Sequence, residues 1–301
     1  MTAYLPAFSI LAGVASLLIS SLFTHQPSAK LPFSVPLNHF YVVLDSETYK
    51  AIEQSPFLRK EFAVNELRTT TRTDMSYTGV YFYGVNTYFE FFDASATAIG
   101  KLSDSGIALG VDHAGGLETI KTDLASKFVL MDPITRGFAG KQVPWFYMAA
   151  PKDFAMDSGL RFWIMEYHPQ FLMEWNPQPN EKNAGISRKQ ILERYARVIR
   201  DTPSKPHLKD VVAIKIAVTQ ETQKDFIELC QLLNYTEHAE GTTRILKGDD
   251  IEFRLIPQTE TARGIQEITL RVDRKPKPTE FRFGTKSVLR FHGNGLATWT
   301  F

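Results

Sequence analysis

Two residues that can bind a metal ion or transfer a proton stand in otherwise apolar and aromatic segments. His39 lies near the start of the segment 37–45, and Glu90 lies among Tyr and Phe in the segment 87–92. Side chains alternate along a strand, so each of these two residues belongs to one defined face. Packing alone does not favour a carboxylate among aromatic rings, because a buried charge needs a partner or a metal. Glu90 therefore indicates a candidate binding site.

A third segment, 160–168, carries Glu166 and His168 on one face. These residues add a second carboxylate and a second imidazole to the candidate set. The simpler alternative is that His39 is a strand-end histidine bonded to the backbone, and that both glutamates meet lysine or arginine partners. The sequence leaves both interpretations open.

Aromatic residues recur in the same segments. They could line a cup that stacks a flat organic ligand, although residues at strand spacing more often form ordinary core. Those we expect to bind such a ligand are Tyr81, Tyr83, Tyr88, Tyr147 and Trp163.

The composition is that of a globular protein. The chain has 301 residues, of which 44% are hydrophobic and 22% charged, and this length allows two domains. A formal net charge of +1 gives no reason to expect nucleic acid as a partner. The single cysteine excludes a disulfide framework and a cysteine-based zinc site. Phosphate-binding loops, the G-x-S-x-G elbow and the H-E-x-x-H pattern do not occur.

The first 36 residues differ in kind from the rest. Residues 5–23 carry no charged side chain and are about long enough to cross a bilayer as a helix. They could equally be an export signal, although no Lys or Arg precedes the apolar run. We therefore expect residues 1–36 to be a signal peptide or membrane anchor with its linker, and the protein to be exported (periplasmic or secreted) or membrane-anchored.

An order of strand, helix and three further strands recurs along the chain. Copies begin near residues 37, 106, 211 and 264, and the fourth has no room for a long helix. This repetition predicts an α+β fold of paired β-α-β-β-β modules. We expect a first domain over 37–175, a linker with an amphipathic helix over 176–207, and a second domain over 208–301.

The module order, with His39 in the first strand and Glu90 in the last strand of its module, resembles the vicinal oxygen chelate superfamily of glyoxalases, bleomycin-resistance proteins and extradiol dioxygenases. The resemblance implies two tandem domains, in each of which paired modules form a cup-shaped sheet. It also implies that ligands to a divalent metal come from the first and last strands of the modules.

Carried onto this sequence, the resemblance implies an uneven set of ligands. His39 and Glu90 fit in the first module. The second module has Gly106 at the first-strand position and supplies Glu166 from its last strand, with His168 as a fourth ligand or a catalytic base. The third module has Ala213 and Arg254 at the two positions, and the fourth has Glu267 at the first but no carboxylate at the second. The second domain is therefore expected to be degenerate.

These residues would suit Fe, Mn, Ni or Zn. The resemblance then implies a protein that binds a small organic molecule in its first domain, as a metal-dependent lyase, isomerase or dioxygenase of the glyoxalase type. The alternatives are a non-catalytic protein that sequesters its ligand and an interaction scaffold. The sequence does not decide whether the protein is an enzyme, and it does not give the oligomeric state.

Overall fold

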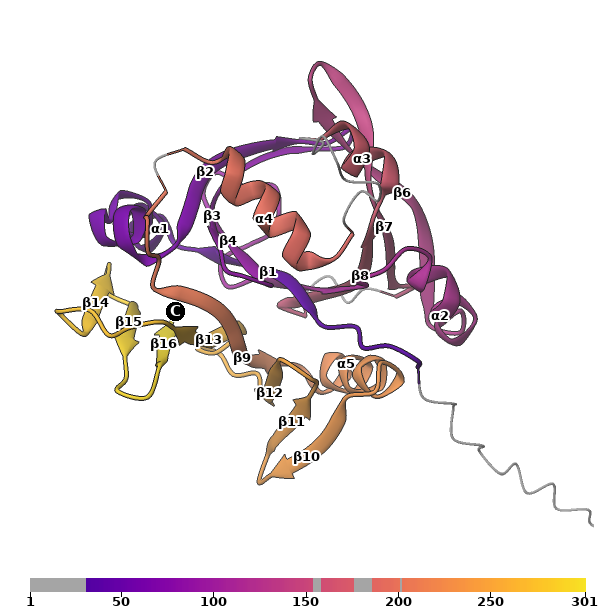
Figure 1. Ribbon diagram of the computed structural model, residues 1–301. Helices are drawn as coiled ribbons and strands as arrows, with labels where there is room; N and C mark the ends of the chain where they lie inside the picture. Colours follow the sequence, from indigo (N-terminus) through magenta and orange to yellow (C-terminus); the bar gives the residue numbers. More distant parts are fainter. Residues whose placement is uncertain (1–30, 154–157, 176–185, 201) are drawn as a thin grey trace, which may run out of the picture.

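The computed structural model describes residues 31–153, 158–175, 186–200 and 202–301. These residues form two curled sheets of eight strands each, stacked on one another with few helices (Figure 1), so the predicted α+β class with cup-shaped sheets is confirmed. The predicted signal or anchor, 5–23, lies outside the described residues. In the part of the chain that the structure describes, no helix has the length and apolar character to span a membrane. The boundaries of the two domains stay a prediction.

Sheet A contains the first two modules. Its strand order is β2-β3-β4-β1-β5-β8-β7-β6, with β1 parallel to β4, β5 parallel to β8, and β1 antiparallel to β5. The strands are β1 (Leu37–Leu44), β2 (Val64–Thr71), β3 (Ser76–Tyr83), β4 (Tyr88–Asp93), β5 (Ser105–Gly110), β6 (Phe128–Phe138), β7 (Lys141–Pro151) and β8 (Leu160–Tyr167). The helices that accompany them are α1 (Ser46–Gln54), the short π-helix η1 (Leu58–Phe62), α2 (Gly116–Leu124), α3 (Pro169–Glu174) and α4 (Arg188–Val198).

Sheet B repeats this order as β10-β11-β12-β9-β13-β16-β15-β14. Its elements are β9 (Leu208–Val218), α5 (Gln220–Leu232), β10 (Thr236–Glu240), β11 (Thr243–Lys247), β12 (Glu252–Pro257), β13 (Gly264–Val272), β14 (Glu280–Phe283), β15 (Ser287–Phe291) and β16 (Leu296–Thr300). The fourth module has no helix, as expected. A parallel return needs a crossover of a dozen residues or more, and residues 273–279 are too few, so β16 runs antiparallel to β13.

The core that holds the sheets together lies between the back of sheet A and sheet B. Phe40, Phe89 and Phe91 point from β1 and β4 into one hydrophobic cluster with Trp299 of β16. The rings of Phe91 and Phe89 lie 5.1 and 6.0 Å from the Trp299 ring, measured between centroids. The Trp299 indole N–H donates to Ser287 Oγ at 2.8 Å, so this buried donor has a hydrogen-bond partner.

Sheet A curls until its edge strands approach each other. The hydroxyls of Thr73, just after β2, and Thr135, on β6, lie 3.4 Å apart. One end of the curl is filled by α3 and α4, whose Phe171, Ile191 and Tyr195 belong to the same cluster as the inward-facing aromatic residues of the sheet. The helix predicted within the linker therefore exists, and it packs inside sheet A.

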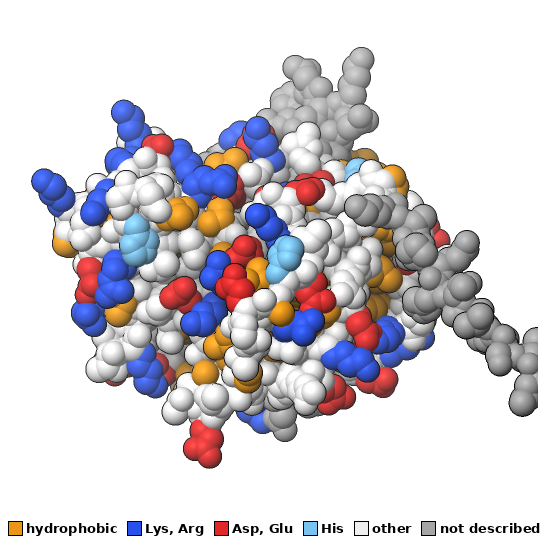
Figure 2. Space-filling model, turned by 90° about the horizontal axis from the view of Figure 1, so that it is seen from below, with side chains coloured by type: hydrophobic (Ala, Val, Ile, Leu, Met, Phe, Trp, Pro, Cys, Tyr) orange, Lys and Arg blue, Asp and Glu red, His pale blue; other side chains and the backbone are white. Residues whose placement is uncertain are grey.

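Sheet B stays open. Lys215 and Arg254, neighbours on β9 and β12, are exposed on its free face. Figure 2, which views the lower side of Figure 1, shows positive and negative side chains interspersed, with hydrophobic ones between them. No large field of one sign covers this face, which agrees with the net charge of +1.

Asp210 ties the two sheets together at the turn between β3 and β4. Its carboxylate accepts hydrogen bonds from the backbone and side chain of Asn86, at 2.7 and 2.9 Å, and from the backbone and hydroxyl of Thr87, at 3.0 and 3.2 Å. Four hydrogen-bond donors from the β3–β4 turn of sheet A therefore converge on one carboxylate of sheet B.

We expect Asp210→Asn to lower the free energy of unfolding by about 1–3 kcal/mol, because the amide offers one acceptor oxygen to four donors. Urea denaturation at pH 7 measures the change. Asp273→Asn is the matched control, because Asp273 has a 54% exposed side chain and lies 3.8 Å from the Lys209 ammonium. That pair should contribute about 0–1 kcal/mol. An equal decrease in the free energy of unfolding in the two variants would contradict the proposed role of Asp210 in joining the two sheets.

Candidate functional site

A cavity of about 550 Å³ lies inside the curl of sheet A. This volume is within the range of small-molecule sites. Val129 and Met131, on edge strand β6, are 45% and 41% exposed and stand at its opening. Most of the lining is aromatic or aliphatic, and it comprises His39, Tyr41, Arg72, Met75, Tyr77, Tyr88, Glu90, Phe92, Ile99, Val129, Met131, Trp145, Phe146, Met148, Ala150, Pro151, Arg161, Trp163 and Met165.

His39 and Glu90 both line this cavity, as expected from their strand faces. The register of β1 and β4 pairs His39 with Tyr88 and Tyr41 with Glu90, so His39 and Glu90 are diagonal neighbours on one face. The His39 ring stacks on Tyr88 with 4.6 Å between centroids and meets Trp163 edge-on at 5.5 Å. Aromatic packing therefore fixes the imidazole in place.

The imidazole of His39 is neutral. Its Nδ1 lies 2.9 Å from the side-chain oxygen of Asn38. Because an amide oxygen only accepts hydrogen bonds, Nδ1 carries the proton and Nε2 keeps its lone pair. Burial, assisted by the positive charge of Arg68, lowers the pKa of His39 to about 3. His39 can thus accept a proton or a hydrogen bond through Nε2.

Glu90 is a buried carboxyl group, 7% exposed. Burial raises its pKa to about 7, against the opposing effects of the Arg68 charge and the Tyr81 hydroxyl. In the described part of the chain, no lysine or arginine forms an ion pair with it. Glu90 therefore exchanges its proton near neutral pH, where a group can both donate and accept.

Arg68 of β2 influences both residues, and sequence reasoning missed it. Its guanidinium carbon lies 3.8 Å from the centre of the Tyr81 ring, and its Nη1 donates to Glu66 at 3.0 Å and to the Tyr83 hydroxyl at 2.9 Å. The Tyr83 hydroxyl in turn donates to Glu66 at 2.6 Å. The spacing of Glu66 and Arg68 on one strand face was the available signal, but the polar segment around them resembles an exposed loop.

The predicted aromatic residues divide into three groups. Tyr88 and Trp163 line the cavity. Tyr81 and Tyr83 face the inside of sheet A, but they pack in the cluster that includes α4 and lie outside the cavity lining. Tyr147 is paired with the back-facing Glu166 on β8, so its prediction as a ligand-binding residue is wrong.

Glu166 does not join His39 and Glu90. Its carboxylate accepts hydrogen bonds from the backbone N–H groups of Gly115 and Leu117, at 2.7 and 2.9 Å. Glu166 thus satisfies the amino end of α2, where a helix presents unpaired N–H groups and favours negative charge. On β8 it alternates with Trp163 and Met165, which face the cavity, so its predicted place in a shared ligand set is wrong.

His168 is also absent from the cavity. It follows β8 and caps α3, where its Nδ1 accepts a hydrogen bond from the backbone N–H of Gln170 at 3.1 Å. Burial lowers its pKa, and its ring lies 4.9 Å from that of Tyr147 on the back of the sheet. The prediction of His168 as a catalytic base or fourth ligand therefore fails, because strand β8 ends before it.

The residues present do not fit a three-ligand metal centre. In the strand pairing Ala108 lies opposite His39, and Arg161 lies beside Gly106 on β8 in the same row of residues in which Glu90 lies beside Tyr41 on β4. Across residues 31–153, 158–175, 186–200 and 202–301, no three His, Cys, Asp or Glu side chains gather as a metal site would need. The cavity therefore offers two residues of the expected kind, His39 and Glu90, and the residue at the other end of the Glu90 row is an arginine, whose guanidinium does not bind a metal ion.

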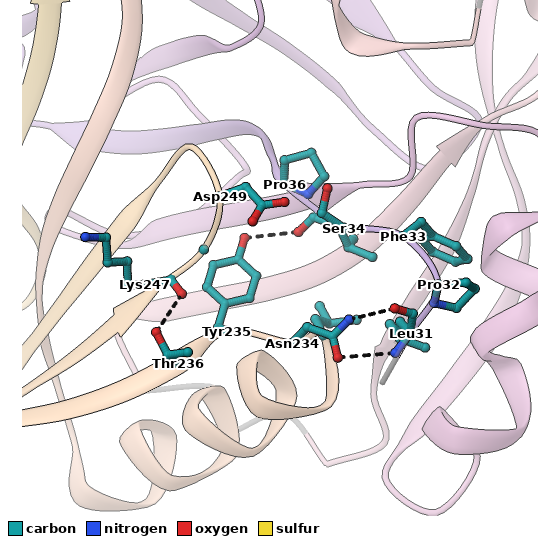
Figure 3. Close-up of a pocket in the computed structure, with 13 residues that line it drawn as sticks. Leu31, Pro32, Phe33, Ser34, Pro36, Asn234, Tyr235, Thr236, Lys247 and Asp249 are labelled. Carbon is teal, nitrogen blue, oxygen red and sulfur yellow. Dashed lines mark hydrogen bonds between the residues drawn. The ribbon is translucent and has the colours of Figure 1, made fainter. Parts of the chain in front are cut away.

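A second cavity, of about 490 Å³, borders the chain that leads into β1 (Figure 3). The Asn234 side chain accepts a hydrogen bond from the backbone N–H of Leu31 at 3.2 Å and donates to its carbonyl at 3.0 Å. The Tyr235 hydroxyl donates to the Val35 carbonyl at 3.0 Å. These bonds fasten residues 31–35 against the end of α5, which is a structural role.

Three solved structures are similar to this chain to different degrees. A crystal structure of a hypothetical protein from Staphylococcus aureus has a TM-score of 0.51 and 14% identity, over 85% of this chain and 98% of that chain. Homoprotocatechuate 2,3-dioxygenase from Arthrobacter globiformis has a TM-score of 0.43 and 9% identity, over 89% and 80%. An extradiol ring-cleaving dioxygenase from B. fuscum has a TM-score of 0.40 and 8% identity, over 91% and 74%. The structure from Staphylococcus aureus shares the fold of this chain, and at 14% identity the likeness concerns the fold alone.

Among curated proteins, none matches this sequence. Residues 37–301, which include both sheets, match the model of a family described as a family of unknown function (DUF5829). Because the match extends over most of the sequence, the chain belongs to the DUF5829 family.

Proposed function

We propose that this protein binds a small, flat, largely apolar organic molecule inside sheet A, as a protein of the vicinal oxygen chelate type. The observation that carries this proposal is the cavity of about 550 Å³, with its aromatic walls and two buried ionisable groups. A site of this size with few polar groups is typical of small-molecule binding.

The walls favour a planar ligand. Tyr77, Phe92 and Trp163 present rings to the cavity, and Met131 and Met148 add flexible thioethers. Rings stack on flat molecules, and methionine adapts to irregular shapes. The ligand would thus be held mainly by burial of its apolar surface.

The polar contacts would come from His39 and Glu90. Nε2 of His39 supplies an acceptor, whereas the Glu90 carboxyl donates below pH 7 and accepts above it, because burial raises its pKa to about 7. These two groups would orient a ligand that carries a hydroxyl or carbonyl group.

Metal-dependent lyase, isomerase or dioxygenase activity has less support than binding. Such chemistry would need a third ligand, and Glu166 is bonded to the amino end of α2. Ligand binding without catalysis, as in the drug-sequestering members of the resembled superfamily, needs only the features that the cavity has. The uncharged segment 5–23 supports the further proposal that the protein is exported or anchored to a membrane.

We expect calorimetric titration to detect binding of 2-naphthamide, with a Kd on the order of 10 μM if each non-hydrogen atom contributes about 0.5 kcal/mol. Met131→Trp should weaken binding about tenfold, because a larger side chain narrows the opening. Leu67→Trp is the control, since Leu67 is 56% exposed on β2 and does not line the cavity. Undetectable binding, or equal losses in both variants, would refute the proposed site.

Glu90 should make stability depend on pH. Its pKa of about 7 in the folded chain exceeds the ordinary 4.5, so between these values folding retains a proton that the unfolded chain releases. The contribution of Glu90 to the free energy of unfolding therefore falls as pH rises, by about 3 kcal/mol in total. Above pH 7 the full decrease in the free energy of unfolding is reached.

Urea denaturation of Glu90→Gln and of the native chain between pH 4.5 and 8 tests this. The stability of the variant relative to the native chain should rise with pH over that window. Taking the difference removes the effect of His39, whose lowered pKa acts in the opposite direction in both proteins. Glu118→Gln, at a 68% exposed position on α2, serves as control. If the difference in free energy of unfolding between the two proteins does not change with pH, burial does not raise the pKa of Glu90.

A further inference from the structure

Arg161 stands on the cavity wall at the position that mirrors Glu90. Tyr41 and Gly106 are paired across β1 and β5, Glu90 lies beside Tyr41 on β4, and Arg161 lies beside Gly106 on β8. Four adjacent strands therefore carry a carboxyl, a phenol, a glycine and a guanidinium in one row. Three strand spacings of about 4.8 Å separate the two ends, or about 14 Å along the sheet.

The charge of Arg161 is not neutralised by a carboxylate. Its Nη1 donates to the Ile99 carbonyl at 3.0 Å, and its guanidinium also interacts with the Tyr41 hydroxyl, where it opposes the rise in the pKa of Tyr41 caused by burial. The side chain is partly buried and lines the cavity. Asp104, in the loop before β5, is bound by Arg263 at 2.7 Å. Among the ion pairs of the described residues, none includes Arg161.

The other arginine on the cavity wall is compensated. Arg72 donates two hydrogen bonds of 2.8 Å to the carboxylate of Asp74. The charge of this guanidinium is therefore already balanced by a carboxylate. Arg161 is thus the cationic group that the cavity can offer to an anion without breaking an existing ion pair.

The surroundings of Arg161 favour a planar acid. Trp163 follows two positions later on the same strand face and presents its ring to the cavity. Tyr41 lies over Gly106 so closely that a Cβ there would be 2.1 Å from its ring, which leaves the phenol beside Arg161. A guanidinium matches a carboxylate in a two-pronged geometry, and a single cation suits a monoanion better than a phosphate dianion.

We propose that Arg161 binds the carboxylate of an aromatic acid whose ring lies in the cavity against Trp163, in a recognition that uses no metal ion. This inference rests on the proposed function and names the ligand class of that site. The acidic end of the ligand would lie at Arg161, because Glu90 at the other end of the row would repel it once ionised. The separation of Arg161 and Glu90 thus sets the orientation of the bound ligand in the cavity.

Calorimetric titration at pH 7.5 with 2-naphthoate and 2-naphthamide tests the inference, because the two probes differ in charge and share their ring. We expect the naphthoate to bind at least about tenfold more tightly to the native chain, since a charge-assisted pair replaces a neutral contact. Arg161→Gln should remove this preference and leave the naphthamide affinity within about twofold. Excess EDTA should change neither affinity.

Two further variants complete the experiment. Arg161→Lys keeps the positive charge but lacks the planar, two-pronged guanidinium, so it should retain part of the preference for the naphthoate. Arg282→Gln, at a 65% exposed position of sheet B, should retain all of this preference. Equal affinities of the two probes for the native chain would overturn the role of Arg161 and leave the proposed function standing. If neither probe binds, the proposed function itself fails. A preference that EDTA abolishes would overturn recognition without metal.

Discussion

The central strands of sheet A are buried on both faces, and the rest of the protein depends on this constraint. Along β1, Phe40 and Val42 enter the core shared with sheet B, while His39 and Tyr41 face the cavity. A shift of one residue in register would exchange the two sets and place a histidine in the hydrophobic core. The packing of Phe89 and Phe91 against Trp299 therefore fixes the cavity as well as the core.

Burial also sets the chemistry of the cavity. The same desolvation lowers the pKa of His39 to about 3 and raises that of Glu90 to about 7, because in both cases it opposes the charged form. Arg68, held by Glu66 and Tyr83, moderates the effect on Glu90. A neutral imidazole and a carboxyl group that titrates near neutrality are the result, in a space lined mainly by rings.

The two sheets share a strand order but serve different purposes. Sheet A closes around a cavity because its edges meet and α4 fills one end, with Ser187 and Gln190 capping that helix reciprocally. Sheet B lacks a helix in its last module and remains open, with charged side chains on its free face. Its packed face supports the back of sheet A, and Asp210 joins the two sheets at a turn.

The sequence by itself determined the α+β class, the repeated module order and the faces of His39 and Glu90, because hydrophobic alternation and turn signals are local. It could not place Glu166 or His168, because the positions and hydrogen-bond partners of these side chains depend on where β8 ends and on which helix lies behind it. It also could not reveal that Arg161 lies in one row of paired residues with Glu90. That relation follows from the pairing of β1 with β5 and of β5 with β8, and register between strands far apart in the chain is decided only when the two cores pack.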